Sequence, residues 1–363
     1  MVDIAADGGS VVGGVGFRLG IIAGVKVLVT GGTGLVGSHA VAAIVRAGHD
    51  VRLLVRRPDQ VPASLGPLGL EVSDIVVGDV LDERAVSRAV EGCAAVVHAA
   101  AVYSLDPRRA QDMRRTNARA TELVLGRAVE RGLDPVVHVS TTVALTRYGG
   151  SGPDLPLGDV ELPYAQSKIA SEKVARRLQD AGAPVVTIYP GGVYGPNDPY
   201  RGEQSEMLRW VLRGRFPLWP RGGLHVVDVR DTAAVIQAVL RPGGGPRRYV
   251  VPGHYMEGDL LFATLAVITG RRFPHLVVPG AVLSPATGLI GAVQRRLPDR
   301  WRYPADREGV EIMRRSTRFD DSAARKELGV EPRSFAETIT DMVRWLVESG
   351  RVPARHAGKL GPA

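Results

Sequence analysis

Tyr164 and Lys168 are the residues whose types and spacing point most directly to chemistry. The segment 163–181 reads as a helix with Pro163 at its first position, so residues four apart lie on one face of it. A lysine ammonium stabilises a neighbouring phenolate and lowers a pKa that is normally about 10, which lets the tyrosine exchange a proton with a substrate oxygen. This spacing is common by chance, so its meaning depends on the elements that precede it.

A glycine-rich turn near the N-terminus predicts a dinucleotide site. The segment 25–37 reads as an apolar strand, a tight turn and the start of a helix. The turn fits both G-x-G-x-x-G and G-x-x-G-x-x-G through Gly31, Gly32, Gly34 and Gly37. Such glycines let the backbone approach a pyrophosphate, and the helix start offers free N–H groups and the positive end of a dipole. Glycine turns also occur for conformational reasons alone, but a strand before and a helix after are the context that this motif requires.

Strands and helices then alternate along the chain. Strands are expected at 51–55, 72–77, 95–98 and 135–139, and helices at 35–47, 82–92, 107–131 and 163–181. This alternation predicts an α/β fold with a doubly wound parallel sheet, in which a ligand lies beyond the carboxyl ends of the strands. The residues expected at those ends, besides the glycine turn, are Arg56, Asp79, His98 and Thr141.

The end of the expected strand 51–55 favours NADP over NAD as the cofactor. An acid at this place hydrogen-bonds the free ribose 2′-hydroxyl, whereas an arginine suits a 2′-phosphate. The chain has Arg56 and Arg57 there and no acid before Asp59. The alternative is that one of these arginines is simply a solvated residue at a strand end and does not bind the cofactor. His98 and Asp79 could contact the cofactor, but a structural role is preferred for both.

Composition excludes several other classes of site. The net charge is +8, but arginines and acids are interleaved, which permits an anionic ligand and does not argue for nucleic acid. The only cysteine, Cys93, excludes an internal disulfide and a cysteine metal cluster, and it is interpreted as a buried packing residue. No metal site is expected. The basic stretch 295–318 also contains acids, so a solvated face is preferred there to a membrane or partner contact. No membrane span or secretory signal is recognised, so the cytoplasm is the expected location.

The ordered set of these motifs resembles the extended short-chain dehydrogenase/reductase family, also described as the NAD-dependent epimerase/dehydratase superfamily. The resemblance runs from Val25 to about Gly350 and is nearest to the dihydroflavonol-reductase and hydroxysteroid-dehydrogenase branch. It rests on the segments 30–37, 78–80, 98–101, 114–121, 140–142, 164–168 and 189–196.

The resemblance implies a role for each matching residue. Tyr164 is the general acid/base, Lys168 lowers its pKa and holds the nicotinamide ribose, and Thr141 orients the substrate carbonyl, with Ser140 and Thr142 as alternatives. Asn117 matches an asparagine near the active site, whose other role would be structural. The cofactor-binding residues implied are Gly31, Thr33, Gly34, Leu35, Gly37, Arg56, Asp79, Val80, Ala99, Ala100, Lys168, Pro190 and Val193.

The predicted domain organisation has four parts. Residues 1–24 are expected to be a flexible extension, 25–190 a Rossmann domain to which 224–251 returns, 191–350 mostly a substrate-binding region, and 351–363 a flexible tail. Helices are expected at 203–214, 257–270, 280–297 and 334–350, and Asp231 is expected to cap the helix after strand 224–229, with structural roles for Asp228 and Asp231 alike. The almost uncharged segment 281–293 could be a lid over an apolar substrate, a packed helix or a membrane-facing patch. A homodimer through helices 107–131 and 163–181 is expected from the resemblance alone.

Three functions remain open on the sequence. The preferred one is an NADP(H)-dependent oxidoreductase that interconverts a ketone and a secondary alcohol of a small, apolar substrate. The second is a nucleotide-sugar epimerase with tightly bound NAD. Arg56 disfavours this function, but Arg209, Arg215 and Arg221 could bind the diphosphate of such a substrate. The third is a non-catalytic dinucleotide sensor, which the Tyr164 and Lys168 pair disfavours. Dehydration is disfavoured because Thr142-Val143 follows Thr141 where family dehydratases have Asp-Glu.

Overall fold

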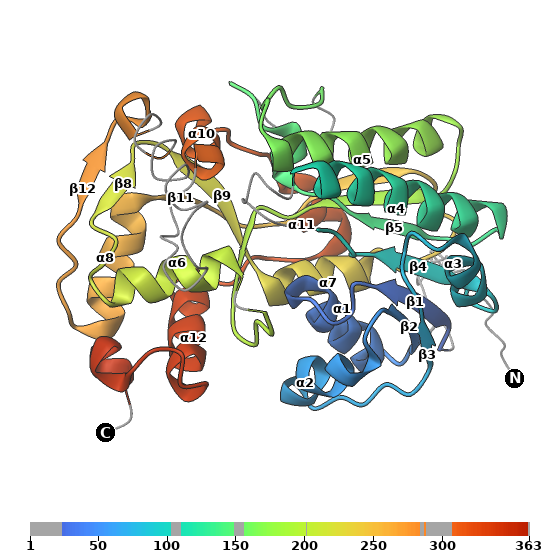
Figure 1. Cartoon of the computed structure of the whole chain (residues 1–363), viewed down its shortest axis with the longest axis horizontal. Helices are drawn as coiled ribbons and strands as arrows, with labels where there is room; N and C mark the ends of the chain where they lie inside the picture. The colour runs from blue at the N-terminus through green and yellow to red at the C-terminus, as the bar shows by residue number, and fades with distance from the viewer. Residues whose placement is uncertain are drawn as a thin grey trace, which may run out of the picture.

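The computed structural model describes residues 24–102, 110–148, 156–200, 202–283, 287 and 307–361. Its centre is a seven-stranded sheet in which every neighbouring pair is parallel. The spatial order is β10 (Arg247–Val250), β6 (Val185–Tyr189), β5 (Val136–Val139), β4 (Ala95–His98), β1 (Lys26–Thr30), β2 (Asp50–Val55) and β3 (Ile75–Val77) (Figure 1). This is the predicted Rossmann-type arrangement.

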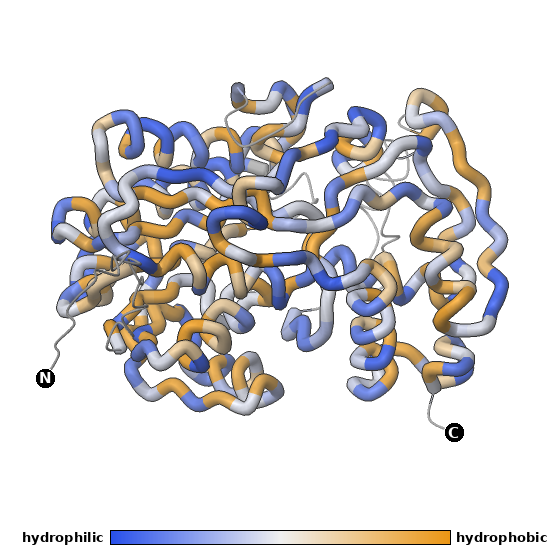
Figure 2. The backbone as a smooth tube through the Cα atoms, turned by 180° about the vertical axis from the view of Figure 1, so that it is seen from behind, coloured by the Kyte–Doolittle hydropathy of each residue, from blue (hydrophilic) through white to orange (hydrophobic). Residues whose placement is uncertain are grey.

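Helices cover both faces of this sheet. One face packs against α3 (Glu83–Val90), α4 (Ala110–Glu130) and α5 (Pro163–Asp180), and the other against α1 (Leu35–Arg46), α7 (Val229–Ala238) and α11 (Ser322–Leu328). The strands are runs of valine, leucine and isoleucine because both their faces are buried. In β1, Val27 and Val29 join the α1 side of the core, whereas Leu28 joins the α3–α5 side. The strands of the sheet are accordingly mostly orange in Figure 2.

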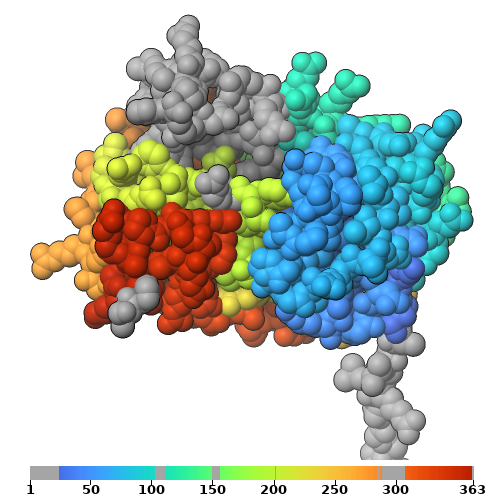
Figure 3. Space-filling model, turned by 60° about the horizontal axis from the view of Figure 1, so that its bottom comes forward, coloured from blue at the N-terminus to red at the C-terminus, as the bar shows by residue number. Residues whose placement is uncertain are grey.

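The C-terminal part has its own core beside the sheet. Its strands are β7 (Gly192–Tyr194), β8 (Leu218–Pro220), β9 (Gly223–Asp228), β11 (His254–Glu257) and β12 (Leu276–Val278). Its helices are α6 (Glu203–Leu212), α8 (Gly258–Thr269), α10 (Arg307–Arg315) and α12 (Phe335–Glu348). Trp219, Phe262 and Met342 are buried together in this second core. Figure 3 shows the red C-terminal elements and the yellow-green segment near α6 on one side of the molecule, and the blue N-terminal elements on the other.

Short helices complete the described part. They are η1 (Pro58–Gln60), α2 (Val61–Leu65), η2 (Gly66–Leu68), η4 (Thr142–Leu145), η6 (Ala354–His356) and η7 (Gly358–Leu360). No helix among the described residues is both long and apolar enough to cross a bilayer.

Three local predictions differ from the structure. The segment 224–251 returns to the main sheet through α7, which covers it, and β10, which joins it, but the expected strand β9 pairs with β7 and β11 in a separate three-stranded sheet. The helix α7 begins at Val229, so Asp228 is its cap and accepts a hydrogen bond from the Arg230 N–H, whereas Asp231 lies in the first turn and accepts from the Arg333 N–H at 2.7 Å. Both acids are structural, as expected.

The third difference is the C-terminal tail. Residues 351–361 pack against the second core, in which Val352 and Ala357 are buried. This packing is difficult to predict from a glycine-rich, basic segment in which few side chains are apolar; Leu360 also packs against this core. Residues 1–23, and most of the expected helix 280–297, lie outside the described residues.

Candidate active site

A cavity of about 970 Å³ opens at the carboxyl ends of the central strands. Its walls come from the glycine turn, the ends of β2 to β5, the start of α5 and the loop after β6, and on the other side from the C-terminal part. The sequence-predicted residues that line it are Gly31, Thr33, Gly34, Leu35, Gly37, Arg56, Asp79, Val80, Ala99, Ala100, Thr141, Tyr164, Lys168, Pro190 and Val193. Chain folding therefore gathers these separate segments around one space.

The glycine turn has the close backbone approaches that its sequence predicts. Gly31 has φ +73°, and a Cβ on it would lie 2.6 Å from the Ala100 nitrogen. A Cβ on Gly37 would collide with the carbonyl oxygen of Gly31. Side chains at either position would push the turn away from the strand or the helix that it joins.

The helix after this turn begins with uncapped N–H groups. Gly34 is the N-cap of α1 and offers no side-chain hydrogen bond, whereas Asp82, Asp228 and Ser334 cap α3, α7 and α12 with their side chains. The first N–H groups of a helix bind anions well, because they lack intrahelical partners and lie at the positive end of the dipole. The turn and the start of α1 thus fit the pyrophosphate of a dinucleotide.

Arg56 and Asp79 lie at the ends of neighbouring strands on the cofactor side of the cavity. The Arg56 Nη1 is 3.9 Å from the Asp79 Oδ2, and three-quarters of the arginine side chain is exposed. Such an ion pair contributes little to stability and leaves the guanidinium available for a ligand. Asp79 also accepts a hydrogen bond from the Leu81 N–H at 2.9 Å, which forms the turn after β3.

Tyr164 and Thr141 meet where the cofactor side joins the substrate side. Thr141 is at the N-cap of η4, just after β5, where its hydroxyl accepts a hydrogen bond from the Val143 N–H at 3.3 Å. Tyr164 is half-buried and lines the cavity. This burial raises the pKa of Tyr164 above its ordinary value, the nearby Glu308 carboxylate raises it further, and the Thr141 hydroxyl lowers it.

Lys168 lies one turn after Tyr164 and is almost wholly buried. Its Nζ donates a hydrogen bond to the Val139 carbonyl at 3.4 Å. Burial lowers the pKa of Lys168 to about 8, against the raising effect of the Glu172 carboxylate. The lysine thus changes its charge much closer to neutral pH than an exposed lysine would.

Two polar residues near the site do not line the cavity. Asn117 accepts a hydrogen bond from the Val102 N–H at 2.7 Å and donates to the Ser167 Oγ at 3.1 Å, so it ties the loop after β4 to α5. His98 is buried on the α4 side of the sheet, where its ring is hydrogen-bonded with the Thr30 and Thr121 hydroxyls at 2.8 and 3.4 Å. Burial lowers the pKa of His98 to about 3, which fits the structural interpretation of this residue.

Two buried carboxylates on either side of Tyr164 and Lys168 were not predicted. Glu172 is fully buried on α5 and accepts hydrogen bonds from the Tyr189 hydroxyl at 2.5 Å and from Arg176 at 3.0 Å. Glu308 on α10 accepts from the N–H groups of Ala165 at 2.6 Å and Tyr164 at 3.3 Å. The spacing of Glu172 four residues after Lys168 is a signal that could have found it, whereas nothing near Glu308 in sequence indicates its contact.

The side of the cavity formed by the C-terminal part is mostly apolar. The C-terminal part contributes the apolar side chains of Met207, Phe216, Leu218, Trp219, Leu224, Met256, Val310, Ile312, Met313 and Phe319. The charged residues among the described lining are Arg56, Arg57, Asp79, Lys168, Asp198 and Glu203. Arg209, Arg215 and Arg221 are not part of this lining, and Arg209 is paired instead with Glu206 on its own helix.

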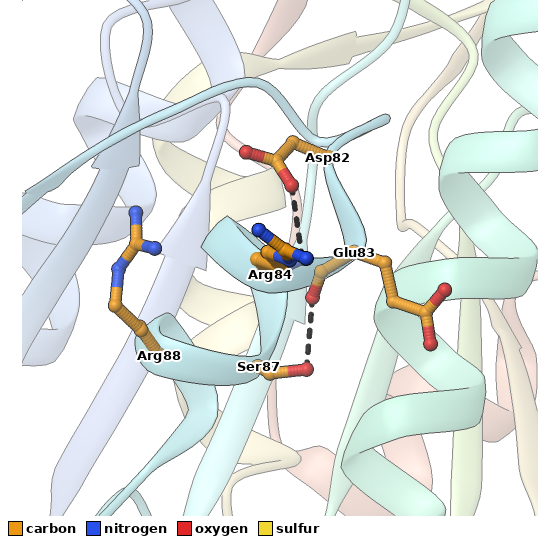
Figure 4. A pocket seen from close by; sticks show the side chains of 5 residues that line it. All are labelled: Asp82, Glu83, Arg84, Ser87 and Arg88. Carbon is orange, nitrogen blue, oxygen red and sulfur yellow. Dashed lines mark hydrogen bonds between the residues drawn. The ribbon is translucent and has the colours of Figure 1, made fainter.

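A smaller depression of about 620 Å³ lies at the start of α3 (Figure 4). Its polar groups are bonded to one another: Asp82 accepts from the Arg84 N–H, and the Ser87 hydroxyl donates to the Glu83 carbonyl. These are the contacts of a capped helix start, and the depression contains none of the predicted site residues.

Comparison with known proteins identifies the family. A model described as the NAD dependent epimerase/dehydratase family matches residues 27–251. The chain belongs to this family. A putative dihydroflavonol 4-reductase of Synechocystis is 30% identical over 89% of this chain and 95% of its own length. Sterol demethylase protein B of Methylococcus capsulatus is 27% identical over 90% and 99%. The crystal structure of the dTDP-glucose 4,6-dehydratase DesIV of Streptomyces venezuelae, with NAD and TYD bound, superposes with a TM-score of 0.68 at 25% identity, over 90% of this chain and 99% of that one.

This membership confirms the resemblance seen in the sequence. The protein is an NAD(P)-dependent enzyme of the extended short-chain dehydrogenase/reductase type. The family contains reductases, dehydratases and epimerases, so the reaction has to be argued from this chain's own site.

Proposed function

We propose that the protein is an NADP(H)-dependent oxidoreductase that interconverts a ketone and a secondary alcohol of an apolar substrate. The observation that carries this proposal is the position of Tyr164. Tyr164 lies one helical turn from Lys168 and lines one cavity together with Lys168 and Thr141, the glycine turn and the apolar side chains of the C-terminal part, and the Thr141 hydroxyl lowers the pKa of Tyr164.

The residues of the site divide the work as follows. A nicotinamide cofactor held at the glycine turn would supply or accept the hydride. Thr141 orients the substrate oxygen by hydrogen bonding, and Tyr164 donates a proton to that oxygen in reduction or accepts one in oxidation. The charge on Lys168 stabilises the phenolate that Tyr164 becomes. Because burial and Glu308 raise the pKa of Tyr164, its hydroxyl is protonated at neutral pH before the cofactor binds, which suits the acid that reduction needs.

The charge distribution supports NADP and an apolar substrate. Arg56 and Arg57 line the cofactor side, where a 2′-phosphate would meet them. The apolar side chains of the C-terminal part face the substrate. A nucleotide-sugar epimerase would have to bind a diphosphate, and among the described residues the substrate side offers the acids Asp198 and Glu203 instead of Arg209, Arg215 and Arg221. The ketoreductase is therefore preferred to the epimerase.

The test compares the wild type with Tyr164→Phe on two substrate sets. Cyclic apolar ketones and UDP- or dTDP-glucose are each supplied with NADPH or NADH, and the small molecules bound to the purified protein are identified by mass spectrometry. We expect NADPH oxidation with an apolar ketone, and a loss of at least about a hundredfold in Tyr164→Phe with unchanged NADPH affinity. Tightly held NAD together with epimerised sugar would replace the proposal by the epimerase, and activity retained in Tyr164→Phe would refute the proposed acid.

A further inference from the structure

The start of the catalytic helix is held by a carboxylate from a segment 143 residues further along the chain. Glu308 is buried near the beginning of α10, and its two oxygens accept hydrogen bonds from the main chain of α5. Oε1 accepts from the Ala165 N–H at 2.6 Å and Oε2 from the Tyr164 N–H at 3.3 Å. One carboxylate thus binds two consecutive N–H groups, one of which belongs to Tyr164.

The sequence of α5 explains why an external carboxylate fits here. The N-cap residue Leu162 offers no side-chain hydrogen bond, and Pro163 at the first position has no N–H. Tyr164 and Ala165 therefore carry the first two N–H groups of the helix, and these have no intrahelical acceptor. A negative charge at this end is also favoured by the helix dipole. Glu308 supplies the cap that α5 does not have in its own sequence.

The helix that carries Glu308 also forms a wall of the cavity. Gly309, Val310, Ile312 and Met313 of α10 line the substrate side. The nine-residue helix α10 thus contacts the catalytic helix through Glu308 in its first turn. The residues after Glu308 line the substrate side of the cavity. The contact joins the C-terminal part to the reacting centre.

We propose that Glu308 is a positioning residue for Tyr164: it fixes the first turn of α5 and keeps a negative charge at the main chain of the tyrosine. This inference rests on the proposed function, in which the Tyr164 hydroxyl is the proton donor. The residue acts through the main chain and the electric field, without touching the substrate.

Among the described residues of α10 and α5, the neighbouring charged groups pair with partners of their own. On α10, Glu311 pairs with Arg314 and Arg315, and Arg315 also pairs with Asp159, which precedes α5. On α5, Lys168 is one turn further along and faces Glu172. Besides burial, Glu308 is the group that raises the pKa of Tyr164, which agrees with the geometry.

The experiment compares Glu308→Gln and Glu308→Asp with Glu311→Gln as the matched control on the same helix. Glutamine removes the charge and can accept only one of the two N–H groups, whereas aspartate keeps the charge on a shorter side chain. The first measurement is amide hydrogen exchange of a peptide containing Tyr164 and Ala165. The second is the pH profile of kcat and KM for NADPH-dependent reduction of the best ketone found with the wild type.

We expect Glu308→Gln to exchange these two amides about tenfold faster or more, since hydrogen bonds to a charged acceptor are lost. Its kcat should fall about tenfold with little change in KM, because the acid is misplaced. The alkaline limb of its profile should move to lower pH by at least about half a unit, because the charge that opposes ionisation of Tyr164 is gone. Glu308→Asp should keep the limb in place, and Glu311→Gln should match the wild type in both measurements.

A uniform loss of kcat without movement of the alkaline limb would reduce Glu308 to a purely structural cap and overturn the proposal. Unchanged amide exchange in Glu308→Gln would overturn it as well. If the wild type reduces no ketone, the proposed function fails by itself, and the exchange measurement still decides whether Glu308 holds the first turn of α5.

Discussion

Replacing Lys168 with methionine should remove a specific pH dependence from the stability of the cofactor-free protein. Burial lowers the pKa of this lysine from its ordinary 10.5 to about 8 in the folded state. Between these two values the unfolded chain binds more protons than the folded one, so the free energy of unfolding of the wild type rises with pH. Below pH 8 both states are protonated, and the folded protein carries the whole cost of a buried ammonium.

The size of the effect follows from the two pKa values. A difference of one pKa unit corresponds to about 1.4 kcal/mol, so the whole window from pH 10.5 to pH 8 is worth about 3 kcal/mol. Between pH 7 and pH 9.5, a practical range for measurement, the stability of the wild type should increase relative to Lys168→Met by about 2 kcal/mol. Methionine has a similar length and no charge. Altered packing in Lys168→Met therefore shifts the free energy of unfolding by the same amount at every pH, whereas the lost charge changes its slope with pH.

Urea unfolding of the two proteins without cofactor, at four pH values across this range, measures the difference. Lys173 is exposed on the same helix, so Lys173→Met is the matched control and its curve should run parallel to that of the wild type. Parallel curves for Lys168→Met and the wild type would refute the reasoning, because Lys168 would then have the same pKa in the folded and unfolded chain. Turnover should be lost in Lys168→Met, since the charge that stabilises the Tyr164 phenolate is gone.

Two further predictions concern the cofactor side. Arg56→Ala should weaken NADPH binding about tenfold or more and NADH binding little, because a charge-assisted contact to the 2′-phosphate is lost. Isothermal titration with both cofactors measures this, and Arg131→Ala, at an exposed position outside the cavity lining, is the control. Equal losses for the two cofactors would show that Arg56 does not bind the 2′-phosphate. Gly37→Ala should destabilise the protein by about 2 kcal/mol or more and abolish dinucleotide binding, because its Cβ would collide with the Gly31 carbonyl. Thermal unfolding and NADPH titration test the second prediction, with Gly66→Ala as the control at a position where a Cβ meets nothing.

The central sheet and the shared location of the site residues could be predicted because one rule governs both. Parallel strands that alternate with helices place all their carboxyl ends at one edge, and every residue chosen from a strand end was a candidate for that edge. Arg56, Asp79 and Thr141 line one cavity for this reason. His98 also ends a strand but is buried on the α4 side of the sheet, where Thr30 and Thr121 bind its ring.

The sequence does not decide between neighbouring residues of the same type that could fill the same role. Asp228 and Asp231 can each cap a helix, and the choice depends on a boundary that sequence leaves uncertain by a few residues. The arginines of the C-terminal part show the same limit for charge. Arg209 pairs with Glu206 on its own helix, Arg215 is exposed, and none of the three arginines that could have met a diphosphate is among the described lining of the cavity.

Glu308 could not be predicted, because its partner is the main chain of a distant helix. The segment around it is rich in arginine and acids and reads as a solvated face, yet this one acid is buried against α5. The contact also limits how the substrate side can vary. Any change of α10 that reshapes the cavity moves the helix that carries Glu308, and with it the charge beside Tyr164. Engineered exchanges of the C-terminal part should therefore keep an acid at the start of α10, or they will alter the proton transfer along with the choice of substrate.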